Sequence, residues 1–568
     1  MKITFYRHRI FYLFVLLLIF MLSQVSRAQE INKEVFVVRP YEPTLSDASK
    51  ISVMPVPEEV ETPIPSFTYK ITPTPIETRF EITPIKPARM VTTVLPKIYK
   101  SYIKIGLGNY LTPLAEFNIS NLHSKEYLMG AYLYHKSSYS TLHLENQDEV
   151  PGGYSVTHVN LYGKKFLPDL TVTGNVILDR DGFNYYGYNV HLPFEVPPLM
   201  DRDDIHQRIL TLGAQAGLHS NYTDSSRLNY KAGIRYNYLT DKTDDRENIL
   251  MIDASFKKLI QTFMGGIDLR IHYFKPDTRM DSTGNTQVSF SPTVSKRTKD
   301  WKFDVGFEGL VDKDEVSRFY IYPIGRLEFT VIEKIMIPFV GVGGKLETNH
   351  YQKILQDNHF VTPGLKVLNA DHKFTAFAGV KGSITPQIAF RADVTYSTVE
   401  NMFFFINDTT AVYPNTTDTI QNTFSVEYDD IDLVQYHGEM AFETPANWDV
   451  KADFTYYSYR THKLDKPWHK PKYELTLNAA YKLKEKFLIR GGFVLIGKRY
   501  AKSSTAFDPE GFVELKTMLD INLGVTYTYS KLFSVFLDIY NVTNRAHLLW
   551  NQYPSQGLNC MIGFAYKL

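Results

Sequence analysis

Residues 473–483 read YELTLNAAYKL, and this stretch decides the fold because its side chains alternate with a period of two. Six aromatic or apolar side chains share one face of an extended chain, at Tyr473, Leu475, Leu477, Ala479, Tyr481 and Leu483. Four polar side chains share the other face, at Glu474, Thr476, Asn478 and Lys482. Successive side chains of a β-strand point to opposite faces, so the stretch predicts a strand with one apolar and one polar face.

The same alternation recurs from about residue 99 onward, for example over 228–238, 388–396, 448–457 and 518–529. A soluble β-sandwich alternates as well, but three features favour a membrane β-barrel. The predicted strands are about 10–14 residues long, whereas sandwich strands average about 5–6. Connections alternate between short and long. Tyrosines gather at the ends of the apolar faces, as in an aromatic girdle, at Tyr236, Tyr238, Tyr396, Tyr456, Tyr459, Tyr527 and Tyr529.

Composition excludes several classes of protein. The net charge is +1 over 568 residues, which gives no broad electrostatic basis for binding nucleic acid. The single cysteine, Cys560, excludes an internal disulfide framework and a cysteine-based zinc site. No run of about 18 apolar residues follows the N-terminal region, so any later membrane insertion must use a β-barrel.

Residues 1–28 have the pattern of a secretory signal peptide. Lys2, Arg7 and Arg9 precede an apolar run over 10–22, and Ala28 ends a small-residue cleavage site before Gln29. We therefore expect export, with cleavage between Ala28 and Gln29.

Residues 29–98 carry eleven prolines. Proline fixes φ and lacks an N–H donor, so this segment is predicted to be an extended arm. One interpretation is a linker or spacer. The other is an arm that lies in or under a larger structure, with KEVFVVRP (33–40) adding as a strand to a partner's sheet.

The alternating segments predict 22 strands. With an even number of strands, the first strand begins and the last strand ends on the same side of the membrane. Short turns are expected on the periplasmic side, and long connections are expected on the extracellular side. The long connections are 184–206, 347–371, 398–431, 499–514 and 542–557. Residues 418–429 are assigned to one of these extracellular loops. The predicted strands cover 99–109, 113–121, 125–137, 154–166, 169–183, 207–220, 226–239, 246–258, 261–275, 286–296, 300–312, 317–331, 334–346, 372–382, 386–397, 432–442, 447–460, 472–483, 486–498, 515–529, 531–541 and 558–568.

The C-terminal residues 537–568 resemble the last hairpin of TonB-dependent outer-membrane receptors. The matching residues are Asn541, Asn544, Trp550, Tyr553, Pro554, Gly557, Gly563, Phe564, Tyr566 and Leu568. The resemblance implies that Gly563, Tyr566 and Leu568 form the signal read by the barrel-assembly machinery. Met561 and Leu568 depart from the usual residues at their positions.

The resemblance does not extend to the family's plug, a globular domain of over a hundred residues. Only the proline-rich segment precedes the predicted barrel, and EVFVVRP is a faint candidate for an energy-coupling box. The chain is thus predicted to be all-β: a large transmembrane antiparallel β-barrel of about 22 strands (99–568) in the outer membrane of a Gram-negative cell, with a proline-rich N-terminal arm and no plug domain.

Polar faces of the strands are expected to line the lumen with charges of both signs. These charges either pair with one another as solvated ladders or form a polar pathway or a bed for an inserted segment. The candidate lumen-lining residues are Asp268, Arg270, Arg391, Asp393, Asp449, Lys451 and Asp453.

No motif indicates catalysis, a cofactor or a resident metal. GFVLIGKR (492–499) lacks the Ser/Thr of a phosphate loop and lies on an alternating strand. The acidic runs at 178–182 and 428–432 lack the ligand spacing of a calcium site. We expect a non-enzyme, and a rim hydrolase assembled from several strands is a distant third alternative.

Two functions remain. The first is a transport-class barrel that binds or passes a solute across the outer membrane. The second is a structural subunit that anchors a larger outer-membrane complex, with residues 29–98 contacting a protein partner. Outer-membrane lipid and the assembly machinery are expected partners in both, and nucleic acid in neither.

Overall fold

The computed structural model of the protein describes residues 99–568, except 122–123, 192–201, 223, 280, 411–420, 445–446 and 504–509. The predicted signal peptide, its cleavage between Ala28 and Gln29, and the arm over 29–98 lie outside the described residues. The described part forms one compact unit, Tyr99–Leu568.

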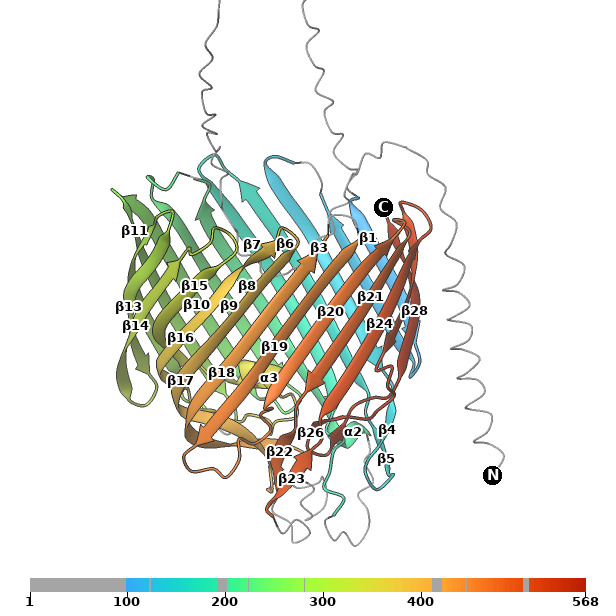
Figure 1. Ribbon diagram of the computed structural model, residues 1–568. Coiled ribbons are helices and arrows are strands. Elements are labelled where there is room, and N and C mark those ends of the chain that lie inside the picture. The colour runs from blue at the N-terminus through green and yellow to red at the C-terminus, as the bar shows by residue number, and fades with distance from the viewer. Residues whose placement is uncertain are drawn as a thin grey trace, which may run out of the picture. The chain divides into compact units, whose positions relative to one another are not determined.

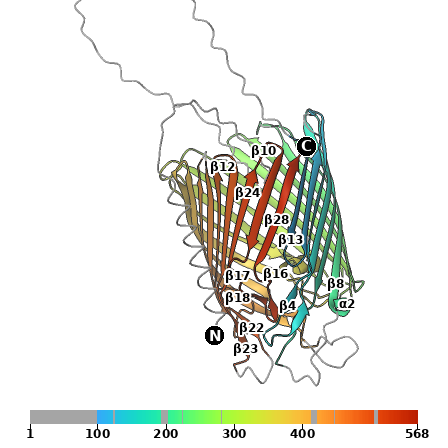
Figure 2. The same ribbon diagram turned by 90° about the vertical axis from the view of Figure 1, so that its right-hand side faces the viewer.

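That unit is a closed antiparallel β-barrel built from one 22-stranded sheet (Figure 1). Each barrel strand pairs with the next along the chain, and β1 pairs with β28 to close the ring (Figure 2). The barrel strands are β1 (Ser101–Gly108), β2 (Thr112–Ser120), β3 (Tyr127–Ser138), β6 (Tyr154–Phe166), β7 (Leu170–Asn184), β8 (His206–Ser220), β9 (Asn229–Asp241), β10 (Arg246–Ile260), β11 (Phe263–Asp277), β12 (Asn285–Arg297), β13 (Trp301–Lys313), β14 (Ser317–Phe329), β15 (Ile337–Glu347), β16 (Ala370–Thr385), β17 (Ile388–Asn407), β18 (Phe424–Glu443), β19 (Trp448–Thr461), β20 (Tyr473–Leu483), β21 (Phe487–Ile496), β24 (Met518–Thr528), β25 (Phe533–Tyr540) and β28 (Asn559–Lys567).

The prediction of a 22-stranded membrane barrel is confirmed, and each predicted segment overlaps one barrel strand. One assignment is wrong. The predicted loop over 398–431 is largely strand, because β17 continues to Asn407 and β18 begins at Phe424. Residues 424–429, assigned to a loop, are the first part of β18.

The two ends of the barrel differ in their connections (Figure 1). Short connections join the strands at the end where β1 begins and β28 ends, which we call the turn end. Long connections lie at the opposite loop end. They carry the hairpins β4 (Thr141–His143) with β5 (Glu149–Pro151), β22 (Arg499–Lys502) with β23 (Phe512–Leu515), and β26 (Leu548–Trp550) with β27 (Tyr553–Pro554). They also carry the helices α2 (Arg202–Ile205) and α3 (Tyr351–Asp357).

The outer wall carries exposed apolar side chains that alternate with inward polar ones. On β11, Ile267, Leu269 and Ile271 are about two-fifths exposed, whereas Arg270 between them forms polar contacts with β12 and β13. Such an apolar wall is stable only against lipid. In the described part of the chain, no helix is long and apolar enough to cross a membrane.

Aromatic side chains mark both edges of this apolar wall. Toward the loop end, the exposed rings are Tyr236, Tyr273, Tyr396, Tyr436 and Tyr456; toward the turn end they are Phe263, Phe329, Trp448, Phe487 and Tyr529. Two such rings are expected at the two interfaces of a bilayer. Tyr459, predicted to join the girdle, instead packs against a buried cluster at the loop end, because it lies on the inward face of β19.

The ladder between β14 and β15 is the shortest in the described barrel. Only Gly325–Glu328 pair with Phe339–Val342. Pro323 has no N–H to donate to a ladder, and β15 is irregular between Gly343 and Lys345. The buried Tyr322 ring covers this seam on the lumen side and donates a hydrogen bond to Asp371 on β16, with a distance of 2.7 Å.

Candidate functional site: a packed cap at the loop end

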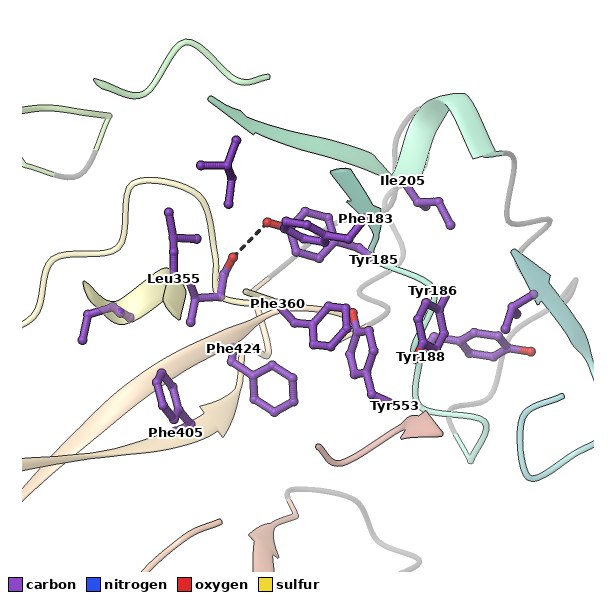
Figure 3. Packing of buried hydrophobic residues seen from close by; sticks show 14 of the residues in the cluster. Phe183, Tyr185, Tyr186, Tyr188, Ile205, Leu355, Phe360, Phe405, Phe424 and Tyr553 are labelled. Carbon is purple, nitrogen blue, oxygen red and sulfur yellow. Dashed lines mark hydrogen bonds between the residues drawn. The ribbon is translucent and has the colours of Figure 1, made fainter. Parts of the chain in front are cut away.

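Several loop-end connections fold inward and pack together over the barrel mouth. We call this structure the cap and define it by its buried core, which Figure 3 shows in part. The core draws on the connections after β3, β7, β15 and β25 and on the loop-end parts of β7, β8, β9, β17 and β18. Its buried residues are Leu142, Leu144, Val150, Phe183, Tyr185, Tyr186, Tyr188, Ile205, Ile209, Leu239, Tyr351, Ile354, Leu355, Phe360, Val361, Phe403, Phe405, Phe424 and Tyr553.

Tyr553, on β27, lies at the centre of the cap and is fully buried (Figure 3). Its ring stacks on Phe360 with centroids 3.8 Å apart and meets the edge of Tyr186 at 4.9 Å. Its hydroxyl donates to the backbone carbonyl of Asn422. Gly187 permits this packing, because a Cβ there would lie 2.6 Å from the Tyr553 ring. One aromatic side chain thus joins three connections that are distant in the sequence.

The helix α3 is fixed to the lumen side of the wall by buried polar contacts. The Glu247 carboxylate on β10 accepts hydrogen bonds from the backbone N–H groups of Tyr351 and Gln352 at 2.9 and 2.8 Å. The Tyr351 hydroxyl donates to Asp241 on β9 at 2.9 Å. Since one face of α3 is buried in the core, these contacts hold the helix across the mouth.

The extensions of β17 and β18 are covered on both faces. Phe403 and Phe405 face the cap core, whereas Phe404 belongs to a second buried cluster with Val399, Ile431 and Trp468. A strand that is buried on both faces needs no alternation. This explains why the apolar run FFFI, at 403–406, was missed as a strand.

The buried side chain of His469 packs against Phe424 of the cap core. The Nδ1 atom of His469 lies 2.8 Å from the carbonyl oxygen of Phe405, and its Nε2 accepts from the N–H of Asn551 at 3.4 Å. Burial lowers the pKa of His469 to about 3. Its side chain is therefore uncharged near neutral pH.

Four of the seven candidate lumen residues, Arg270, Arg391, Asp393 and Asp453, form ion pairs, and the other three do not. Arg270 forms an ion pair with Glu308 and donates to Ser289 at 3.0 Å, while Asp268 shares its strand. Asp393 accepts from Arg391 at 2.7 Å, and His437 lies between Asp393 (3.4 Å) and Asp453 (2.8 Å). Within the described barrel, no ion pair joins Asp449 or Lys451 to another side chain.

Sequence reasoning did not identify His437 as the bridge between Asp393 and Asp453. It also missed Lys381, which shares Glu328 with Arg326 at 2.9 Å each. Their signal is present in the sequence: both alternate with apolar residues on predicted strands. The contacts of His437 and Lys381 become visible only once the strand register is known, because both residues reach partners on other strands.

The three residues of the predicted assembly signal lie where the barrel closes. Gly563 pairs with Gly106 on β1 and Phe536 on β25, and a Cβ at Gly563 would lie 2.2 Å from the carbonyl oxygen of Ile105. Tyr566 pairs with Ile103, and the backbone N–H of Leu568 donates to Ser101. Met561, the departure from the expected pattern, packs against Leu114 and Phe536. Recognition by the assembly machinery stays a prediction.

Among the described residues, no group of three or more His, Cys, Asp or Glu side chains is arranged to hold a metal ion.

No protein-family model and no curated protein sequence matches the chain. Solved structures do share its fold. The siderophore receptor PirA from Acinetobacter baumannii aligns with a TM-score of 0.63 at 9% identity, over 82% of this chain and 80% of that one. An FrpB iron transporter from Neisseria meningitidis aligns at 0.62 and 11% identity, over 84% and 82%. The ferric-catecholate import receptor Fiu from E. coli K12 aligns at 0.60 and 10% identity, over 83% and 82%.

These neighbours confirm, for the barrel, the resemblance to TonB-dependent outer-membrane receptors that the C-terminal hairpin indicated. At 9–11% identity the likeness establishes the fold alone. The chain is thus a membrane-spanning β-barrel with the fold of outer-membrane receptors.

Proposed function

We propose that the protein is an outer-membrane receptor barrel that binds or passes a solute, and that the cap is its closed gate at the cell surface. The observation that carries this proposal is the combination of a receptor-type 22-stranded wall with a mouth closed by a packed core. We also infer a non-enzymatic role, because the solved structures that share this fold are transport receptors.

The lumen wall supports passage of a polar solute. Charges of both signs line it. Arg270 pairs with Glu308 two strands away, and His437 contacts Asp393 and Asp453 on its two neighbouring strands. The cap is then the barrier at the loop end, and residues 29–98 are the proposed second barrier or partner-binding arm.

A structural role is the second candidate, and the cap favours it. A mouth sealed by aromatic packing needs no opening if the barrel only anchors a larger complex. In that case residues 29–98 contact the protein partner, and the plug of the receptor family has been replaced by that arm.

Planar-bilayer conductance of four forms separates these proposals: the full mature chain, a chain without 29–98, the Tyr553→Ala/Phe360→Ala cap variant, and the combination. We expect the full chain to be silent and the combination to give large openings. Silence of all four forms, with a stoichiometric partner co-purifying through 29–98, contradicts the transport proposal and supports the anchor. Tyr529→Ala is the control, because this exposed ring lies at the turn end, away from the cap.

A further inference from the structure

A groove of about 1070 Å³ crosses the outer wall over β3, β6, β7, β8 and β9. The strand register explains its shape. Gly163 on β6 lies opposite Gly174 on β7, and Gly174 lies opposite Ala216 on β8. These three small residues form the floor. Met129 on β3 lies opposite Gly163, and Ile234 on β9 lies opposite Ala216, so these two residues form the sides of the groove.

The floor is open space. An added Cβ at Gly163 would have no neighbour closer than 3.7 Å, and the same holds at Gly174. With neighbouring strands about 4.8 Å apart, a floor three strands wide spans roughly 10 Å between strand axes. A depression of this width in a wall that faces lipid must be filled by something apolar.

The groove has one polar end. Lys100 lines it at the turn end together with Ser120 and Asn121, and Lys100 is exposed. The rest of the lining that points outward is apolar, with Met129, Leu161 and Val176 more than half exposed. The lining therefore complements an amphiphile that has hydrocarbon along most of its length and an anionic group at one end.

We propose that this groove binds a membrane phospholipid with an anionic headgroup, its acyl chains over Gly163 and Gly174 and its phosphate beside Lys100. Hydrocarbon in the groove restores the dispersion contacts that the small floor residues leave unmade. A cation near the interface attracts an anionic headgroup. The inference depends on insertion of the barrel into a membrane and is independent of gating by the cap.

Native mass spectrometry of the full mature chain, released from nanodiscs of phosphatidylglycerol or of phosphatidylcholine, tests the proposal. We expect retained lipid, with a preference for phosphatidylglycerol. The double variant Gly163→Leu/Gly174→Leu fills the groove and should reduce the retained fraction by about tenfold or more. Lys100→Gln should keep binding but lose the preference for the anionic lipid.

Gly438→Leu is the matched control, since Gly438 also points outward from a barrel strand and a Cβ there meets nothing within 4 Å. Its retained lipid should equal that of the unmodified chain. Heat-modifiable migration on gels confirms that each variant has folded. Equal retention by the filled and unfilled grooves overturns the proposal. The proposal is also overturned if the groove-filling variant retains as much lipid as the unmodified chain but loses a bound protein or a bound second copy of the chain.

Discussion

Phe360 and Tyr553 stack with their ring centroids 3.8 Å apart, although one follows β15 and the other precedes β28. This contact joins opposite parts of the loop end across the barrel mouth. Because neither residue belongs to a ladder of the wall, we expect the loss of this contact to affect the cap more than the barrel.

Tyr553→Ala should loosen the cap without unfolding the barrel. Removing a large buried aromatic side chain typically costs about 3–5 kcal/mol, and here the loss falls on the cap core alone. Limited proteolysis should become faster in the connections 348–369 and 541–558, while heat-modifiable migration on gels stays unchanged. Tyr529→Ala, which removes an exposed ring, should leave the cleavage rates as they are. Loss of heat-modifiable migration in Tyr553→Ala would show that the cap and the barrel unfold together.

Acid should open the cap. Burial lowers the pKa of His469 to about 3, whereas an unfolded histidine titrates near 6.5. Between these values the open state binds more protons than the closed state, so cap stability is complete above about pH 6.5 and falls as the pH drops toward 3. Hydrogen exchange in the peptide around 466–470 should therefore accelerate between pH 7.5 and pH 5, after correction for intrinsic rates.

The matched control is His143→Gln, since this histidine is more than half exposed; its acid response should equal that of the unmodified chain. His469→Gln should flatten the response, because it removes the group that gains the proton. An acid response of the same size in His469→Gln would assign the effect to other groups.

The wall was predictable from the sequence, whereas the cap was not. A lipid-facing strand must alternate, so each of the 22 strands carries its own local signal, as YELTLNAAYKL does in β20. The cap residues carry no such signal. Phe403, Phe404 and Phe405 can be consecutive because two different clusters cover the two faces of β17. A run of three aromatic residues predicts burial, but it does not indicate which other residues will pack against it.

The candidate lumen residues show a similar limit. Their inward direction follows from the period of two, and the sequence therefore located Asp393 and Asp453 on the polar face. Their link through His437 depends on which strands are neighbours and in what register, which alternation alone does not determine. The groove on the outer wall has the same origin, because Gly163 and Gly174 meet only through the pairing of β6 with β7.

Gly563→Val should prevent closure of the barrel. A Cβ at this position would lie 2.2 Å from the backbone carbonyl oxygen of Ile105 and 2.4 Å from the Phe536 ring, so β28 cannot keep both of its neighbours. We expect loss of heat-modifiable material from the membrane fraction, as for deletion of 558–568. Gly438→Val, with open space around its Cβ, should insert normally. Normal insertion of Gly563→Val would show that the β1–β28 closure tolerates a side chain.

The seam between β14 and β15 should be where the wall exchanges first. Only four residue pairs join these strands, so backbone groups in the first half of β14 lack ladder partners on that side. Amides within 317–324 should exchange faster than those of 302–306 on β13, which are paired on both sides. Tyr322→Phe removes the hydrogen bond to Asp371, at a cost of about 1–3 kcal/mol for a buried group left unpaired, and should raise exchange at 317–324 further. Equal protection of the two segments in the unmodified chain would mean that lipid or another group completes the β14 edge.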